Sequence, residues 1–325
     1  MTTTVVKTIG TASRDYATIA LYATYVDAVD LGATDTIQEG DLYNDGEFAV
    51  AGAVGTFSNA TVLAADYIKL IPAAGQGFYD NPNVRNNALS YNQTNGVGLN
   101  DTATGGSSTC LSFTSTPFTR ITGLQLKSTD GRALSINSAN VTVSNCIIYG
   151  VNSFILELGA TVTSAVFNNC LLKADQTGGN ALMGDDATTV SATFNFCTII
   201  GLGDYYVNNS GTETYVNCAF FGGGTTAFNF NGSPVSQTFD HCMTNITGTT
   251  GLTGGKIFGA QFVNTTNDFR VKAGADLINA GTPVGGITTD ISGFARNAST
   301  PTIGCWEFAP SIGTTTYHWY QSVKI

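Results

Sequence analysis

The sequence predicts an all-β protein, a single chain wound into a parallel β-helix with a short N-terminal capping helix. The first observation is composition: the 325 residues include 48 Thr, 27 Asn and 38 Gly, whereas charged residues make up only 11%. Threonine favours strands, while Asn and Gly favour tight turns. The other two observations are a repeat of about 24 residues marked by cysteine, and a short polar turn that bears Asn in four of the five copies.

The excess of acidic over basic residues excludes two classes of expected partner. The chain carries 13 basic and 23 acidic residues, for a formal net charge of −10. Contacts to phosphates or to an anionic membrane surface need clustered cations, so we expect neither nucleic acid nor a membrane as a partner. The start, MTTTVVKTIG, has no basic region followed by an apolar core, so we expect synthesis in a cytoplasm without export by a signal peptide.

Five segments that each hold one cysteine form the repeat, and the steps between successive cysteines are 24, 27, 21 and 24 residues. These cysteines are Cys146, Cys170, Cys197, Cys218 and Cys242. A period of 20–50 residues indicates a solenoid, a propeller or an array. The segment 119–126 fits one step earlier, with Leu124 in the cysteine position.

Each copy has apolar positions of opposite strand phase on either side of a short polar corner. Two places after the cysteine the residues are mostly apolar, and three places before it all of them are. The preceding set is Val143, Phe167, Phe194, Tyr215 and Phe239. Because side chains alternate along a strand, both sets face inward only if the chain turns between them. The corner dipeptides are Ser144-Asn145, Asn168-Asn169, Asn195-Phe196, Val216-Asn217 and Asp240-His241. Asn tolerates the left-handed backbone that a sharp corner needs.

A further short strand recurs in each copy, at 133–137, 154–158, 181–185, 205–209 and 228–232. Strand, corner, strand, loop and strand together make one coil, which pairs with the next coil at ~4.8 Å. The cysteines then form one interior column. Disulfide Cβ atoms lie nearer ~3.8 Å apart, so we expect free, buried thiols. The seven cysteines include no C-x-x-C pair, and we expect no metal site and no cofactor.

The N-terminal residues 15–29 are expected to form an amphipathic helix that covers the open apolar end of the coils. Asp15 is the expected N-cap. The inward face of this helix is Ile19, Tyr22, Ala23 and Val26.

Three further segments precede the regular repeats. Residues 36–52 look like a hairpin that turns at Asn44-Asp45-Gly46, and residues 67–72 like a buried strand. Residues 73–110 are rich in Gly and Asn, and we expect long loops there. The acids Asp41, Asp45 and Glu47 lack the spacing of a calcium loop, and a hairpin turn explains them.

The last third of the chain has no Asn-Cys corner, and its motifs resemble the closing segment of right-handed parallel β-helix, pectate-lyase-like proteins. The matching residues are Phe269-Arg270-Val271, Asp276 to Thr282, Thr289 to Gly293, Arg296 and Ile303 to Phe308. The opening IGTASRDYATIALYATYV is similar to the start of such proteins. The resemblance implies a single-stranded right-handed parallel β-helix. It extends to surface proteins, polysaccharide-active enzymes and bacteriophage virion proteins, and so implies no single function.

Four regions are expected from these patterns: an N-terminal cap with the first coils (1–105), regular coils (106–265), a closing segment (266–311) and a C-terminal arm (312–325). The arm contains Tyr317, His318, Trp319 and Tyr320. So much apolar surface is costly to leave in water. Two interpretations stay open: the arm docks on a neighbouring subunit, or it packs back on its own coil.

Acidic pairs are the one feature that would support catalysis on a polysaccharide. Hydrolysis needs two carboxyl groups ~5–9.5 Å apart, which is one or two coils on the same face. Asp175 with Asp204 is the first pair, and Glu157 with Asp185 or Asp186 is the second. We prefer to interpret these acids as solvated loop and turn residues. If the protein is an enzyme, Asp175 and Asp204 are the expected catalytic residues.

Other candidate sites have simpler explanations. His241 and His318 are the only histidines, and no G-x-S-x-G motif accompanies them, so a Ser-His-Asp triad is not expected. The corner residues Asn145, Asn169 and Asn217 could be mistaken for a binding row, but hydrogen bonding within the coil stack explains them. The aromatic residues that could stack on sugars are Tyr149, Tyr205, Tyr206 and Phe221, and we prefer half-buried packing for them.

Two functions are consistent with these observations. The favoured hypothesis is a non-enzymatic bacteriophage virion structural protein, such as a head decoration or cement protein or another tail- or neck-associated β-helix. It would be located in the virion, form a homotrimer and contact capsid or tail subunits. The alternative is a tailspike-type protein that binds or depolymerises a host glycan.

Overall fold

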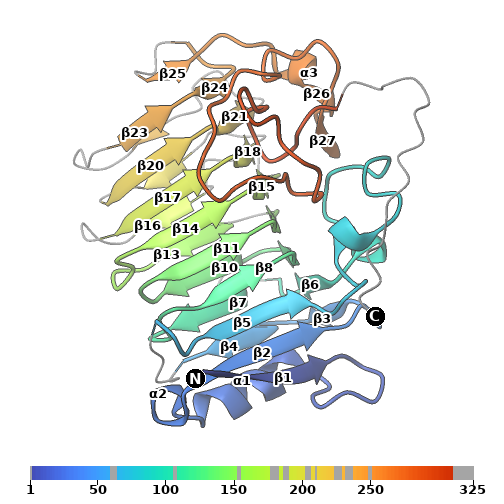
Figure 1. Ribbon diagram of the computed structural model, residues 1–325, viewed down its shortest axis with the longest axis vertical. Coiled ribbons are helices and arrows are strands. Elements are labelled where there is room, and N and C mark those ends of the chain that lie inside the picture. The colour runs from blue at the N-terminus through green and yellow to red at the C-terminus, as the bar shows by residue number, and fades with distance from the viewer. Residues whose placement is uncertain are drawn as a thin grey trace.

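The computed structural model describes residues 2–58, 64–104, 108–151, 155–175, 183–185, 190–201, 206–208, 211–222, 229–230, 237–247 and 251–309, and in 183–185, 206–208 and 229–230 only their backbone. Three parallel sheets run along one rod, and in the regular coils the chain passes from each sheet to the next (Figure 1). This is a parallel β-helix, as the repeat predicted.

The first sheet holds the strands that precede the Asn corner, and the second sheet holds those that follow it. The first sheet is, in order, β1 (Thr3–Ile9), β2 (Thr36–Leu42), β5 (Ile68–Pro72), β8 (Arg120–Thr122), β11 (Val141–Ser144), β14 (Ala165–Asn168), β17 (Ser191–Asn195), β20 (Thr212–Val216) and β23 (Gln237–Asp240). The second sheet is β3 (Phe48–Val50), β6 (Gly98–Asp101), β9 (Gln125–Ser128), β12 (Ile147–Gly150), β15 (Leu171–Ala174), β18 (Thr198–Gly201), β21 (Ala219–Gly222), β24 (Cys242–Thr244) and β25 (Leu252–Thr253).

The third sheet contains the short strands expected after each cysteine segment. Its order is β4 (Gly55–Phe57), β7 (Thr109–Thr114), β10 (Arg132–Asn137), β13 (Leu156–Leu158), β16 (Met183–Asp185), β19 (Tyr206–Asn208) and β22 (Asn229–Phe230). Short elements complete the described chain: the helices α1 (Ile19–Asp27), α2 (Leu31–Thr34) and α3 (Phe258–Gln261), the 3-10 turns Phe78–Asp80 and Gln93–Asn95, and the antiparallel pair β26 (Phe262–Asn264) and β27 (Asp268–Val271).

The corner between the first and second sheets has left-handed backbone in six successive coils. The residue immediately before the cysteine position has φ between 49° and 71° in each of them. These residues are Gly123, Asn145, Asn169, Phe196, Asn217 and His241. The predicted corner is therefore confirmed. In one coil the left-handed residue is Phe196 rather than Asn195, although this conformation costs a residue with a Cβ roughly 1–2 kcal/mol.

Two columns of side chains fill the rod on either side of this corner. The five repeat cysteines are at most 1% exposed, and Leu124 continues their column. The aromatic column stacks ring on ring, with centroid distances of 4.6 Å for Phe167–Phe194, 4.9 Å for Phe194–Tyr215 and 5.2 Å for Tyr215–Phe239. Both inward phases are as the sequence predicted.

All seven cysteines are free and buried, as expected. Each thiol from Cys170 to Cys242 lies within hydrogen-bonding distance of a backbone carbonyl in the preceding coil, at 3.3–3.6 Å. Burial raises the pKa of the Cys146 and Cys197 thiols well above the ordinary value. The thiolate is the reactive form, so these groups are protected both sterically and chemically.

Thiol labelling tests this arrangement directly. We expect a thiol reagent to label none of the seven cysteines in the folded protein within the time that labels a free cysteine completely. In denaturant all seven should react, which mass spectrometry counts as seven adducts. Rapid labelling of native protein, or fewer than seven reactive thiols after unfolding without reductant, would contradict a column of buried free thiols.

At the N-terminus, α1 covers the end of the first coil, and its buried face is Ile19, Tyr22, Ala23 and Val26, as predicted. Gly40 and Gly55 leave the space that Tyr22 and Ile19 occupy. The predicted N-cap was wrong: Thr18 caps the helix by accepting from Leu21 N. Asp15 instead accepts from Thr8 N and Oγ1.

The predicted hairpin over residues 36–52 was also wrong. β2 pairs in parallel with β1 and β5, whereas β3 belongs to the second sheet and pairs with β6. The turn at Asn44-Asp45-Gly46 is therefore a corner between sheets, and such corners use the same residues as hairpin turns. The predicted buried strand at 67–72 is β5, and the region expected to be loops contains β6 as well.

Candidate functional site

The described part of the closing segment, residues 266–309, covers the outer face of the second sheet together with the preceding strand β26 (Figure 1). Three outward side chains of that sheet, Leu171, Ile200 and Phe221, are fully buried because the segment lies over them. This second core is completed from β26 and the segment by Phe262, Phe269, Val271, Leu277, Ile291, Ile303, Cys305 and Trp306. The sequence indicated that another segment covers this face, because apolar residues at outward strand positions are normally shielded from water.

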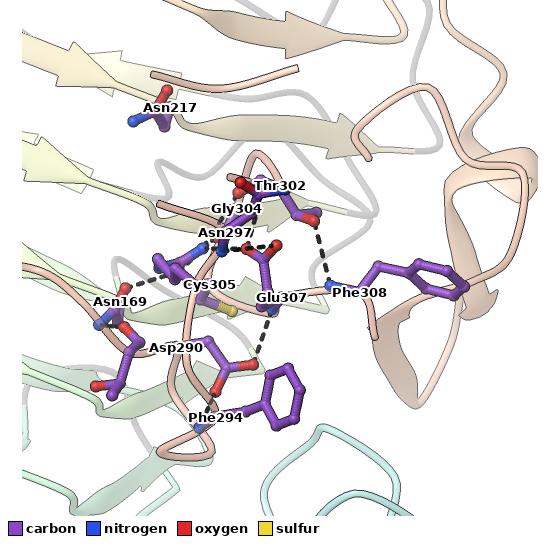
Figure 2. A network of polar contacts seen from close by, with 12 residues as sticks. Asn169, Asn217, Asp290, Phe294, Asn297, Thr302, Gly304, Cys305, Glu307 and Phe308 are labelled. Atoms are coloured by element: carbon purple, nitrogen blue, oxygen red, sulfur yellow. Dashed lines mark hydrogen bonds and ion pairs between the residues drawn. The ribbon is translucent and has the colours of Figure 1, made fainter. Parts of the chain in front are cut away.

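Arg296 is the centre of the polar contacts that hold the segment in place. Its guanidinium donates to Asn169 Oδ1 at 2.7 Å, Gly304 O at 3.0 Å and Thr302 O at 3.2 Å. It also pairs with Glu307 at 3.4 Å, and Figure 2 shows these partners converging on one point.

Two corner residues of the coils, Asn169 and Phe196, contact the Arg296 guanidinium. Its guanidinium carbon lies 3.9 Å from the centre of the Phe196 ring, so the left-handed Phe196 has a stacking partner. Arg296 is 8% exposed, and burial lowers its pKa while Asp290 and Glu307 oppose that change.

Asp290 joins the closing segment to the long loop 73–97. Its Oδ1 accepts from Ser292 and Phe294, and its Oδ2 accepts from Glu307 N and pairs with Arg85 at 2.8 Å. The Arg85 guanidinium also donates to Glu307 O at 2.7 Å, and it lies 4.0 Å from the Trp306 ring. A contact across 205 residues of sequence therefore fastens the loop to the closing segment.

The corner Asn residues also hold the closing segment, which is more than the role within the coil stack that the sequence suggested. Asn169 donates to Asn145 Oδ1 in the stack, and also to Thr289 O. Asn217 donates to Thr282 O at 2.7 Å and accepts from Thr282 N at 2.8 Å. This row therefore binds the protein's own chain.

Asn217 offers a test of this dual role. Asn217→Ala should destabilise the protein by about 2–4 kcal/mol, because it removes two hydrogen bonds and replaces Asn, which tolerates the left-handed backbone at φ 55°, by a residue that does not. Asn217→Gly should recover about 1–2 kcal/mol of that loss, since glycine removes only the backbone cost. Urea unfolding measures both variants, and equal costs would contradict the assigned backbone contribution.

Of the expected catalytic acids, only Asp175 lies within the described chain, and Asp204 lies outside it. Asp175 pairs with Lys173 at 3.1 Å and accepts from the Tyr149 hydroxyl. Lys173 is 7% exposed and donates to Thr266 O at 2.7 Å. Asp175 therefore takes part in contacts that join β12, β15 and the closing segment.

The second acidic pair is only partly described. Glu157 on β13 pairs with Arg132 at 2.9 Å and accepts from Ser135 Oγ at 2.7 Å. The Asp185 side chain and Asp186 lie outside the described part of the structure. Among the other candidates, His241 is at an exposed corner beside Asp240, Phe221 is buried and Tyr149 is half-buried, while the side chains of Tyr205 and Tyr206 are not described.

One depression on the described surface has a volume of about 470 Å³ and is lined by Arg296, Ile278, Phe294, Asn297, Glu307, Phe308 and Ala309. We call it the closing-segment pocket. Another, of about 280 Å³, lies on the first sheet beside Arg120 and Thr142, where the Arg120 guanidinium carbon lies 3.7 Å from the centre of the Tyr67 ring.

Asp41, on the outer face of the first sheet, gives the clearest pH dependence. Burial and the neighbouring Glu39 raise its pKa from 3.8 to about 6. The folded protein then holds this proton more tightly than the unfolded chain, so stability falls as pH rises from about 4 through about 6.

Asp41→Asn should therefore raise the melting temperature above pH 6 and leave it unchanged below pH 4. Asp276→Asn is the matched control, because hydrogen bonds from Lys256 and Gln261 lower the pKa of Asp276 and give its stability contribution the opposite sign. Thermal unfolding between pH 3 and pH 8 measures both. A loss of stability in Asp41→Asn at pH 7 would contradict the raised pKa.

Within the described ranges, no three His, Cys, Asp or Glu side chains are grouped so as to hold a metal ion. No described helix has the length and apolar character needed to cross a membrane.

Three parallel sheets joined by left-handed corners, with a terminal segment closing one outer face, define the chain as a parallel β-helix protein. Among solved structures it is similar to the crystal structure of pectate lyase Pel9A, with a TM-score of 0.45 and 13% sequence identity over 93% of this chain and 97% of that chain. No protein-family model matches the chain. A search of curated proteins found no match either.

Proposed function

We propose that this protein is a structural component of a bacteriophage virion, either a head decoration or cement protein or another tail- or neck-associated β-helix. The observation that carries the proposal is that four acidic side chains of the described chain make structural ion pairs. These pairs join one coil to another, or join the coils or the loop to the closing segment, and the acids are Asp175, Glu157, Asp290 and Glu307. A rod with its N-terminal end and one outer face covered by its own chain suits a load-bearing subunit.

Particle analysis tests this proposal. Antibodies raised against the protein should decorate intact, gradient-purified virions in immunogold micrographs, and mass spectrometry should find it there in a fixed number of copies per particle. The matched control is a non-structural protein of the same infected cells, which should be lost on purification. Presence of this protein only in the cell lysate would overturn the proposal.

A tailspike-type role in glycan binding is the second candidate, and the depression on the first sheet favours it. Arg120, which is stacked on Tyr67 and donates to its hydroxyl at 2.9 Å, lines the depression beside Thr142, so a cation and a hydroxyl are available to a sugar. Glycan-array binding that Arg120→Ala reduces at least tenfold would support this role. Release of reducing ends that Asp175→Asn abolishes would indicate depolymerisation and contradict a purely structural subunit.

A further inference from the structure

We propose that the closing-segment pocket receives the aromatic C-terminal arm of a second copy of this chain. The inference deepens the proposed structural role and rests on it, because it names the contact through which subunits would join. It starts from the pocket itself, whose walls Ile278, Phe294 and Phe308 are apolar. Phe294 is 39% exposed there, although it is a large apolar side chain. A volume of about 470 Å³ falls within the ~300–1,000 Å³ of pockets that bind molecules with several rings.

Glu307, in the pocket lining, can accept a hydrogen bond from an aromatic side chain that carries an N–H or O–H group. Glu307 Oε2 accepts from Thr302 N at 2.9 Å and pairs with Arg296, whereas its Oε1 accepts one long bond, from Asn297 N at 3.4 Å. Oε1 can therefore accept a further hydrogen bond from an indole N–H or a phenol O–H. Tyr and Trp are the side chains that combine a large apolar ring with such a donor.

The arm has this chemistry and carries no acidic residue. Residues 314–325, TTTYHWYQSVKI, contain Tyr317, Trp319 and Tyr320 together with Lys324 and no acidic residue, in a protein of net charge −10. The attraction between a cationic arm and an acidic protein favours the encounter of two copies.

The position of the chain end favours exchange between copies. Ala309, the last described residue, lies in the pocket wall, and seven residues separate it from Tyr317. These seven span up to ~25 Å when extended. Five of the seven, namely Pro310, Ile312 and Thr314 to Thr316, favour extended backbone, whereas Ser311 and Gly313 do not. A return into the arm's own pocket would require reversal within this linker, whereas an extended linker carries the arm to a neighbour.

Each copy would then donate one arm and accept one, and a closed ring of such contacts gives a dimer or trimer.

The experiment uses full-length chains. Trp319→Ala removes the anchor of the arm, and Phe294→Ser removes a wall of the pocket. Light scattering after size exclusion should find an oligomer for the natural sequence and monomers for each variant. Leu21→Ser, at an exposed site on the capping helix, is the control and should keep the oligomer.

Mixing the two variants gives the decisive result. Trp319→Ala retains the pocket and Phe294→Ser retains the arm, so an equimolar mixture should form a heterodimer through one intact contact. A labelled peptide of residues 314–325 should bind Trp319→Ala at least tenfold more tightly than Phe294→Ser, whose melting temperature shows whether it is folded.

Three outcomes would overturn the inference. They are a monomeric natural protein, an oligomer that survives Trp319→Ala, and a mixture that stays monomeric. A monomer in which the peptide binds Trp319→Ala alone would mean that the arm occupies its own pocket. The virion test is separate: incorporation of the protein into particles while the arm variants change nothing would refute the arm exchange and leave the structural role standing.

Discussion

Arg296→Ala is expected to release the closing segment from the coils and to lower the free energy of unfolding by about 3–5 kcal/mol. Breaking a buried ion pair leaves the remaining charge without compensation, which accounts for a cost of that size. Here the remaining charge is Glu307, which is 3% exposed, and Asn169 and Phe196 would lose their shared partner as well. Hydrogen exchange should accelerate throughout 268–308, and a dye that binds apolar surface should report the uncovered second core.

Two comparisons make the Arg296 result specific. Lys256→Ala removes a surface pair with Asp276 and should cost under about 1 kcal/mol. Removing both buried charges with Arg296→Met and Glu307→Gln should restore part of the stability that Arg296→Ala loses, because no unpaired charge remains. Unchanged exchange protection of the closing segment in Arg296→Ala would show that the apolar contacts alone hold it.

Phe194→Ala should cost about 3–5 kcal/mol, which is typical for a large buried aromatic residue. Phe194 is completely buried and stacks between Phe167 at 4.6 Å and Tyr215 at 4.9 Å. The cavity would lie in the middle of the rod, where neighbouring coils on both sides lose contacts. Denaturant unfolding measures the cost, and hydrogen exchange should locate the weakening in β14, β17 and β20.

Val166→Ala is the matched control for Phe194→Ala. Val166 is on β14 and pairs with Thr193, the residue before Phe194, but it belongs to the opposite, half-buried face of the same sheet. We expect a cost under about 1 kcal/mol, since little surface is removed from a site that water already reaches. Similar costs for the two variants would mean that Phe194 does not lie in a packed interior.

The repeat was predictable because each coil must solve the same packing problem. The cysteine column, the aromatic column and the left-handed corner follow from alternation along a strand and from the tolerance of Asn for left-handed backbone. Local turns were less predictable, because Asn44-Asp45-Gly46 suits a hairpin and a sheet corner equally well. The choice of Asp15 over Thr18 as N-cap failed for a similar reason, since both residues can cap a helix.

The position of the closing segment depends on contacts that the sequence does not reveal. Arg85 and Asp290 are 205 residues apart, and no spacing rule brings them together. Outward apolar residues such as Leu171 and Phe221 do indicate that a cover exists, but not which segment supplies it. Of the expected site residues, Asp175 takes part in structural contacts, while Asp204 and the arm residues Tyr317, His318, Trp319 and Tyr320 lie outside the described chain.

The interior row of sulfur atoms is the central structural claim, and anomalous scattering from sulfur in a crystal tests it most directly. The five atoms of Cys146, Cys170, Cys197, Cys218 and Cys242 should form one row along the rod axis, with steps near the ~4.8 Å spacing of paired strands. Peaks scattered over the surface, or joined in pairs at the ~2.05 Å of a disulfide, would contradict it.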